Sequence, residues 1–409
     1  MDLHYAQGEA IFTKVNQVPR QYPYLTEDIE TEVVVIGGGV TGAIVSYYMS
    51  EAGIRCTLLE KSRIAHGSTS ITTSLLQYEL DSNARELEQY TSLQNVVRSY
   101  KLGLKALKEI DNFIQVYGNQ CEYAKRDTLL YTNKQAESAQ MEEEYKVRKE
   151  AGLPVDFIGS ENNPFSFELK GGVYSHEGGA QLDPYQYTHQ LLEVSAQKGL
   201  NIYENTEVIK INYLAEGVEL ETVYGHKVKA KKVILATGYD TGRFSNRNFG
   251  TKTVTYNIAT KPVSTLEGWM NKVLIRDNND PYHYYRTTQD HRILAGGEDI
   301  PFNPGIFDEQ AADERYDRLE QKIKEMFPNI PDIEKEYTYC GAFASTQDNL
   351  GFIGPDTKHQ HLWYCLGYGA NGILFAILGG LMLSKLYKGE KDDDLDLFRI
   401  DRFDGRGMF

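Results

Sequence analysis

Cysteine is scarce in this chain: only Cys56, Cys121, Cys340 and Cys365 occur among 409 residues. None belongs to a C-x-x-C pair, and their spacing indicates neither a zinc site nor a disulfide framework. Reduced thiols are typical of the cytoplasm, so we predict a cytoplasmic protein without a metal centre.

Long apolar segments are also missing. The N-terminus is polar and lacks the apolar core of a signal peptide. The most apolar run, Ile373–Leu383, is shorter than the roughly 20 residues that a membrane span requires, and it contains two glycines. We therefore predict a buried helix there and no membrane span.

Basic residues are outnumbered, with 43 Lys and Arg against 58 Asp and Glu and a formal net charge of −15. Nucleic acids and anionic membranes select for basic surfaces, so neither is expected as a partner. Hydrophobic residues make up 41% and charged residues 25%, as in ordinary globular proteins. A chain of 409 residues exceeds the usual size of one core, which predicts two domains.

The most informative motif lies between Val33 and Glu60. A buried strand, Val33–Ile36, runs into a turn that fits G-x-G-x-x-G, and a helix and a second strand, Cys56–Leu59, follow. This order is typical of a dinucleotide-binding βαβ unit, in which a strand, a glycine turn, a helix and a second strand are followed by an acidic residue, here Glu60. The turn and its neighbours are Gly37, Gly38, Gly39, Val40, Thr41 and Gly42.

Each part of this unit has a physical purpose. Gly37 permits the tight turn, Gly39 lets the backbone approach a pyrophosphate, and Gly42 allows helix and strand to pack closely. The helix N-terminus offers free N–H groups and a positive dipole end to the phosphates. Glu60 lies where a carboxylate accepts hydrogen bonds from ribose hydroxyls. The unit therefore predicts nucleotide binding, and a glycine-rich turn in an unrelated α/β domain is the alternative.

Strands and helices then alternate in an order that favours interleaved domains. A second buried strand ends in Ala236-Thr237-Gly238, far from the first unit, and strand and helix material at 362–386 is suited to rejoin the same sheet. We predict a mixed α/β fold in which a Rossmann-like domain (1–90, 165–250 and 335–409) is interleaved with a substrate domain. That second domain (90–165 and 250–335) is expected to form a mixed, largely antiparallel sheet.

Several segments together resemble the D-amino-acid oxidase superfamily of flavoproteins, the group that holds sarcosine oxidase, glycine oxidase and gamma-glutamylputrescine oxidase. The likeness is carried in order by Val33–Glu60, His66–Ser74, Val233–Tyr239, Thr346–Gly354 and Gly367–Gly372. The last two segments are similar to the T-x-D-G-x-P-x-I-G and G-x-G-x-x-G ending of that family.

The resemblance implies FAD, held without a covalent bond. Serine and threonine hydroxyls near residue 70 are expected to contact phosphate, ribitol or the ring, although by themselves they indicate only a polar loop. The N–H groups of Gly369–Gly372, ahead of the Ile373 helix, are suited to the negative charge that hydride transfer leaves near flavin N1. By itself this segment is more typical of a glycine-rich turn packed on the sheet. Besides the glycine turn, the expected FAD ligands are Glu60, Lys61, Ser68, Thr69, Thr72, Thr73, Val208, Thr237, Gly238, Gly369, Asn371, Gly372 and Ile373.

Departures from the family bear on the substrate. Amino-acid and glycine oxidases place an arginine just before the T-x-D segment to bind a carboxylate, whereas Gly341–Ser345 has none. The lysine that sarcosine oxidase places near the flavin has no counterpart in the strand Arg292–Gly297. Cys340 lies one residue away from the register that covalent flavin attachment would require.

The expected pocket is aromatic and polar. In Tyr282–Arg286, strand alternation places Tyr284 and Arg286 on one face and His283 and Tyr285 on the other. Arg286 is a candidate ligand for an acidic substrate group, and a salt bridge is the alternative. His283 is a structural histidine or a base, although hydride loss from a neutral amine requires no base. The candidate residues for the reaction site are Arg286, Tyr284, Tyr256 and Phe343.

The function predicted from these features is oxidation of a C–N bond in an amine or an N-substituted amino acid. The substrate passes hydride to flavin N5, and oxygen is the expected acceptor. One alternative is an amino-acid dehydrogenase of the same fold that passes electrons to a quinone or a partner protein. The other is an NAD-dependent dehydrogenase that uses only the Val33 unit.

Overall fold

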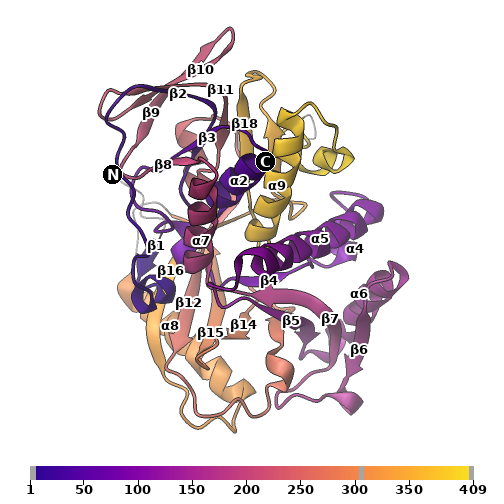
Figure 1. Ribbon diagram of the computed structural model, residues 1–409. Helices are drawn as coiled ribbons and strands as arrows, with labels where there is room; N and C mark the ends of the chain where they lie inside the picture. The colour runs from indigo at the N-terminus through magenta and orange to yellow at the C-terminus, as the bar shows by residue number, and fades with distance from the viewer. Residues whose placement is uncertain (1–5, 304–307, 405–409) are drawn as a thin grey trace.

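The computed structural model describes residues 6–303 and 308–404, which form two sheets that share one chain. The smaller sheet lies at the top of Figure 1 and the larger sheet at the bottom. The chain crosses between them repeatedly, so neither unit is continuous in sequence. The predicted fold class, a mixed α/β protein with a largely antiparallel second sheet, is confirmed.

The smaller sheet is built around parallel strands in the order β8-β3-β2-β11-β18. An antiparallel strand closes one edge, and a hairpin extends from β11. Val33, Val34 and Val35 are completely buried, as expected for a central parallel strand covered on both faces. Its strands are β2 (Ile29–Ile36), β3 (Cys56–Leu59), β8 (Asn201–Tyr203), β9 (Val208–Leu214), β10 (Gly217–Thr222), β11 (Lys227–Leu235), β17 (Phe352–Pro355) and β18 (Leu362–Leu366).

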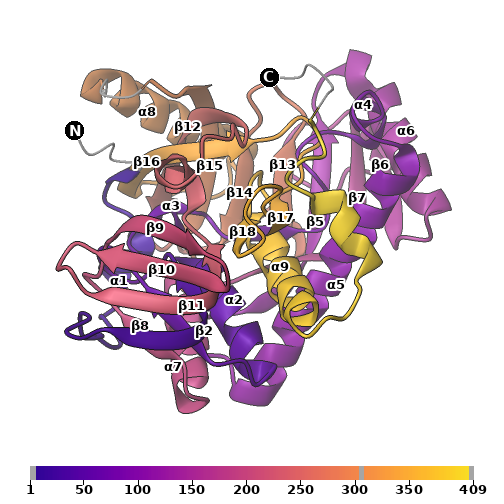
Figure 2. The same cartoon turned by 90° about the horizontal axis from the view of Figure 1, so that it is seen from above.

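Helices cover the face of the smaller sheet that points toward the middle of the molecule. Helix α9 (Gly372–Tyr387) is apolar around most of its circumference and packs against α2 (Val40–Glu51) and α5 (Leu93–Tyr117). Figure 2 shows α9 beside α5, seen from above. A helix that is apolar on all sides is buried, which is what the Ile373–Leu383 run predicted. No helix among residues 6–303 and 308–404 has the length and apolar character to cross a membrane.

The larger sheet has the order β1-β16-β12-β15-β14-β13-β5-β7-β4, with β6 paired to β7. All neighbours are antiparallel except β13 and β5. Helix α8 (Glu309–Met326) packs on its outer face around Tyr316 and Leu319. The strands are β1 (Ala6–Gly8), β4 (Leu75–Gln77), β5 (Ala124–Thr132), β6 (Val155–Gly159), β7 (Gly171–Gln181), β12 (Thr251–Thr260), β13 (Leu274–Asp277), β14 (Tyr284–Thr287), β15 (Ile293–Pro301) and β16 (Lys335–Ser345).

Four strands, with β1 at the N-terminal edge as the first, differ from the predicted division of the chain. We assigned the segments that contain β1, β4, β7 and β16 to the nucleotide-binding domain, but these strands lie in the larger sheet. Strand β7 gave no clear strand pattern because it contains four glycines. At Gly179 a Cβ would lie 2.5 Å from the carbonyl oxygen of Leu76, so the close approach of β4 requires glycine there. The remaining domain boundaries stay predictions.

The other helices connect the two sheets or cover their edges. The N-terminal residue of helix α7 is Pro184, and the Asp183 side chain accepts hydrogen bonds from the first-turn N–H groups, as expected for a helix start. The Ser92 hydroxyl caps α5 in the same way. The helices not yet described are α1 (Ile11–Val15), α3 (Ser68–Ile71), α4 (Ala84–Leu87), α6 (Ser138–Glu150) and α7 (Pro184–Gln197).

Candidate active site between the two sheets

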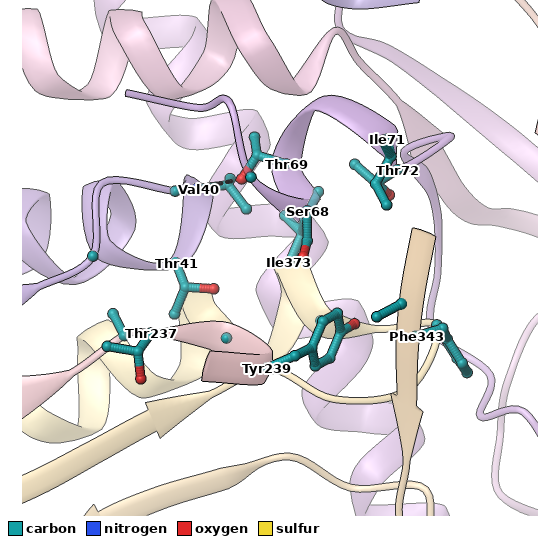
Figure 3. A pocket seen from close by; sticks show the side chains of 18 of the residues that line it. Val40, Thr41, Ser68, Thr69, Ile71, Thr72, Thr237, Tyr239, Phe343 and Ile373 are labelled. Atoms are coloured by element: carbon teal, nitrogen blue, oxygen red, sulfur yellow. Dashed lines mark hydrogen bonds between the residues drawn. The ribbon is translucent and has the colours of Figure 1, made fainter. Parts of the chain in front are cut away.

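One cavity of about 320 Å³ lies between the smaller sheet and the larger sheet. At one end it is lined by Gly37 and the start of α2, and at the other end by Tyr284 and Phe343 of the larger sheet. Figure 3 shows Thr41 and Thr237 near one end and Phe343 near the other, with Ser68 and Ile373 between them. The nucleotide motif and the candidate reaction site therefore share one space.

The glycine turn adopts a conformation that side chains would prevent. Gly37 has φ +112°, and a Cβ there would lie 2.4 Å from the carbonyl oxygen of Ala236. A Cβ on Gly42 would lie 1.8 Å from the carbonyl oxygen of Gly37. Gly37 and Gly42 are therefore required by the backbone itself, the first for its conformation and the second for close packing.

The start of α2 has the properties of a phosphate site. Gly39 is the N-cap residue, and no side chain of its own caps the helix. The hydroxyl of Thr69 accepts a hydrogen bond of 2.9 Å from the N–H of Val40. The first turn of a helix has free N–H groups and a positive dipole end, which suit a pyrophosphate. The residues present therefore fit the phosphate part of a dinucleotide.

Glu60 lines the cavity beside this turn and organises the backbone around it. One carboxylate oxygen accepts a 2.6 Å hydrogen bond from Gly38 N–H, and the other accepts a 2.8 Å bond from Ser62 N–H. Burial raises the pKa of the Glu60 carboxyl, while the hydrogen bonds from Gly38 and Ser62 oppose that rise. Lys61 pairs with Asp240 at 2.8 Å, and both residues line the cavity.

The polar segment after the second strand is a short helix, α3, where the sequence predicted only a loop. Its residues and the two that follow provide hydroxyl groups on one wall, at Ser68, Thr69, Thr72 and Thr73. Val208, Thr237 and Gly238 line other parts of the same cavity. All of these residues line one cavity, and their contact with FAD stays a prediction.

A second helix N-terminus reaches the cavity at α9. Gly369, Gly372 and Ile373 line the cavity, and Gly369 has φ +74°, which favours glycine. The N–H of Ala370 donates to the Asp81 carboxylate at 3.1 Å. Asn371 does not line the cavity. Its amide nitrogen donates to the carbonyl oxygen of Glu79 at 2.8 Å, so it ties α9 to strand β4 and the residues after it.

Most of the residues predicted to bind FAD are brought together by the fold. Gly38, Gly42 and Asn371 do not line the cavity: the two glycines act through their backbone and Asn371 through its side-chain amide. The predicted FAD ligands that line the cavity are Gly37, Gly39, Val40, Thr41, Glu60, Lys61, Ser68, Thr69, Thr72, Thr73, Val208, Thr237, Gly238, Gly369, Gly372 and Ile373.

Tyr284 and Phe343 line the end of the cavity formed by the larger sheet. The Tyr284 hydroxyl is 3.0 Å from the Thr255 hydroxyl and donates to Asn257 at 3.0 Å. The Tyr284 ring lies across Gly296, where a Cβ would be 2.3 Å from the ring. Two hydrogen bonds and this close contact fix the ring as a wall of the cavity.

Arg286 does not lie in the cavity, and its environment does not fit the carboxylate ligand that we expected. Its guanidinium is buried and donates to the carbonyl oxygens of Thr73, Thr287 and Leu182. The alternation on this strand is confirmed, because Tyr284 and Arg286 share a face and Tyr285 packs in the core beneath α8. The prediction that Tyr284 and Arg286 share a face was correct, but the segments around Thr73 and Leu182 separate Arg286 from the cavity.

Tyr256 and Cys340 also point away from the cavity. Both belong to the core beneath α8, where the Tyr256 ring packs against Tyr316. Burial raises the pKa of the Cys340 thiol. His283 is held between Asp277 at 2.9 Å and Glu298 at 3.0 Å, and these carboxylates raise its pKa against the opposing effect of burial. Of the two interpretations of His283, a structural histidine or a base, these contacts favour the structural histidine.

Three further residues, which the sequence analysis did not give as site residues, line the part of the cavity that the larger sheet forms: Arg276, Tyr282 and Asp299. Arg276 follows the apolar residues Leu274 and Ile275, and a charge inside a short apolar strand is a signal that could have revealed it. Asp299 follows a glycine pair and gave no such signal.

Comparison with known proteins agrees with this geometry. The family model described as "FAD dependent oxidoreductase" (DAO) matches residues 32–386. A glycine oxidase of Bacillus subtilis (strain 168) is 24% identical over 91% of this chain and 97% of its own length. A second Bacillus subtilis (strain 168) protein, YhfW, named for a Rieske 2Fe-2S iron-sulfur protein, is 26% identical over 93% of this chain and 73% of its own length. The crystal structure of L-proline dehydrogenase from P. horikoshii has a TM-score of 0.78 at 18% identity and covers 94% of this chain and 100% of that one.

Proposed function

Because the chain belongs to the DAO family of FAD dependent oxidoreductases, we propose that it oxidises a C–N bond of an amine or an N-substituted amino acid. The observation that carries this proposal is the single cavity that joins the α2 N-terminus to Tyr284 and Phe343. A dinucleotide cofactor in that space would extend from the glycine turn to the larger sheet. Because the matching family is FAD dependent, it does not favour the alternative of an NAD-dependent dehydrogenase.

The residues around the cavity have separate roles in this proposal. The α2 N-terminus and Glu60 hold the nucleotide part of FAD, and the α9 N-terminus at Gly372, further along the cavity, stabilises negative charge on the flavin. Bound FAD would supply the hydride acceptor. Tyr284 and Phe343 orient the substrate and exclude water. We propose noncovalent FAD because Cys340 is buried beneath α8, away from the cavity.

The purified protein is expected to be yellow, and amines are expected to bleach it faster than glycine or D-alanine in the absence of oxygen. The reason is that Gly341–Ser345 holds no arginine that could bind a carboxylate next to the reacting carbon. The visible spectrum should be recorded before and after anaerobic mixing with D-alanine, glycine, sarcosine and a gamma-glutamyl amine. A colourless protein, or fast bleaching by glycine and D-alanine alone, would contradict this proposal.

The electron acceptor has two candidates. We propose oxygen, as in the glycine oxidase relative, but two comparisons favour a dehydrogenase as the alternative. One is with a protein named for a Rieske 2Fe-2S centre and the other with an L-proline dehydrogenase. A protein that hands electrons to a partner would retain a similar cavity.

Peroxide measurement separates these acceptors. With oxygen as the acceptor, aerobic turnover is expected to release about one hydrogen peroxide per substrate oxidised. Rapid anaerobic bleaching followed by very slow recolouring in air, with turnover restored by an artificial quinone, would instead support the dehydrogenase.

Cytoplasmic location remains a prediction, supported by four cysteines that are all buried and free.

A further inference from the structure

Arg276 on β13 is a buried guanidinium that lines the cavity. Its residue exposure is 3%, and Nη1 donates to the carbonyl oxygens of Leu80 and Asp81, each at 2.8 Å. Its Nε is buried and donates to no described group. Within 4.0 Å it forms no ion pair with any residue that the structure describes.

Other buried arginines in this chain are satisfied by the protein itself. Arg148 donates from Nε to Glu144 at 2.8 Å, and Arg286 uses three carbonyl oxygens. The Arg276 charge also acts on the Asp81 carboxylate, although no ion pair joins them. A buried N–H without a hydrogen-bond partner destabilises the folded state, so it is retained mainly where something else binds it. Arg276 is the buried arginine that combines an unpartnered Nε with a place on the cavity wall.

Asp299 is a carboxylate at the same end of the cavity, and it has an oxygen atom that lacks a hydrogen-bond donor. The Oδ1 atom of Asp299 is buried and has no hydrogen-bond partner among the described residues. Burial raises the pKa of this carboxyl to about 6. The rings of Tyr282 and Tyr284 lie 5.9 Å apart, and the Arg276 guanidinium is 5.6 Å from the centre of the Tyr282 ring. One end of the cavity thus holds a cationic group, an anionic group and two aromatic rings.

The sheet register brings these side chains to one face. Arg276 lies opposite Tyr284 on β14, and Tyr284 lies opposite Gly296 on β15, so the three share a face of the sheet. Since Gly296 has no side chain, Tyr284 lies across it and reaches Thr255. Arg276 therefore faces the same cavity as the tyrosine wall.

We propose that Arg276, on β13, binds the carboxylate of the substrate, and that Asp299 accepts a hydrogen bond from a substrate nitrogen. This inference rests on the proposed function. The planar guanidinium matches a carboxylate, and charge-assisted hydrogen bonds are the strong ones. The substrate would then be an amine that also carries a carboxylate, recognised at two points.

This anion site lies far from the position that Phe343 occupies. Four strand spacings separate β13 from β16 in the sheet order, which at about 4.8 Å each is about 19 Å between the backbones. A carboxylate on Arg276 therefore extends in a different direction from one held at residue 343. Substrates whose carboxylate is several bonds from the reacting nitrogen fit this arrangement.

Benzoate and its neutral analogue benzamide test the proposal directly. Each is titrated into FAD-loaded protein, and the visible flavin spectrum reports binding. Arg276→Met is expected to weaken benzoate binding by at least about tenfold and to leave benzamide binding and FAD content unchanged. The matched control is Arg85→Met, which removes an exposed guanidinium on α4 that pairs with Glu88. Asp299→Asn is expected to weaken benzylamine binding without weakening benzoate binding.

Equal benzoate affinity in wild-type and Arg276→Met protein would overturn the assignment, as would wild-type protein that does not prefer benzoate to benzamide. Arg276 also donates hydrogen bonds to the carbonyl oxygens of Leu80 and Asp81, so the methionine variant risks misfolding. If it does misfold, Arg276→Lys is the variant that tests the proposal. Lysine keeps the charge but loses the planar fork, so the preference for benzoate should fall several-fold. An unchanged preference overturns the proposal. In yellow protein these failures leave the proposed function intact, whereas colourless wild-type protein contradicts that function instead.

Discussion

Gly39→Val protein is expected to purify folded but colourless. Gly39 has an ordinary φ of −76°, so valine causes no backbone strain, and the nearest atom to a Cβ there is Thr69 Oγ1 at 3.0 Å. The added methyl groups would occupy the space in front of the α2 N-terminus, where the pyrophosphate approaches. Overpacking costs about 1–3 kcal/mol, and the lost N–H contacts add to it, so FAD affinity should fall at least about a hundredfold.

The measurement is the ratio of flavin absorbance to protein absorbance, together with thermal unfolding in the presence and absence of added FAD. Gly242→Val is the matched control, because a Cβ at Gly242 meets no atom within 4 Å and the residue does not line the cavity. Wild-type flavin content in Gly39→Val would place the phosphate site elsewhere. The same substitution at Gly37 or Gly42 would not be informative, because the backbone itself would have to move.

Glu60→Ala is expected to release FAD readily and to turn over at a nearly normal rate when FAD is saturating. The carboxylate holds the N–H groups of Gly38 and Ser62, and it lines the nucleotide end of the cavity, far from Tyr284. A lost charge-assisted hydrogen bond costs about 1.5–3 kcal/mol, which is roughly ten- to a hundredfold in affinity. Flavin fluorescence after dilution reports the dissociation.

Glu334→Ala, which removes an exposed acid paired with Lys261, is the control and should retain FAD like the wild type. If Glu60→Ala also retains FAD, the carboxylate only supports the turn. If turnover at saturating FAD falls as steeply as FAD retention, Glu60 influences the reacting end and its assignment to the nucleotide end is wrong.

The nucleotide end was largely predictable because its rules are local. The spacing of Gly37, Gly39 and Gly42 between two apolar runs specifies strand, turn and helix within a few dozen residues. The expected helix after the turn starts at Val40 in the structure, directly after the glycine that caps it. The conformations at Gly37 and Gly42 explain why those two positions require glycine.

The substrate end was less predictable because it depends on register between distant strands. Alternation correctly placed Tyr284 and Arg286 on one face, but it carries no information on what covers that face. The carbonyl oxygens of Thr73 and Leu182 cover Arg286, whereas Arg276 reaches the cavity because β13 pairs with both β5 and β14. Neither pairing is encoded near the arginine in the sequence.

The order of strands in the smaller sheet limits when the cofactor can be bound during synthesis. Its central strand β2 leaves the ribosome well before its neighbour β11, which has β18 on its other side, and α9 follows later still. The glycine turn at Gly37 and the helix start at Gly372 line one cavity, so that cavity is complete only after Gly372 has emerged. Nascent chains must keep apolar strands such as Val33–Ile36 from aggregating until then. A nascent chain that ends before Gly372 therefore lacks one wall of the proposed FAD site, so the cofactor is expected to bind only after α9 has been synthesised.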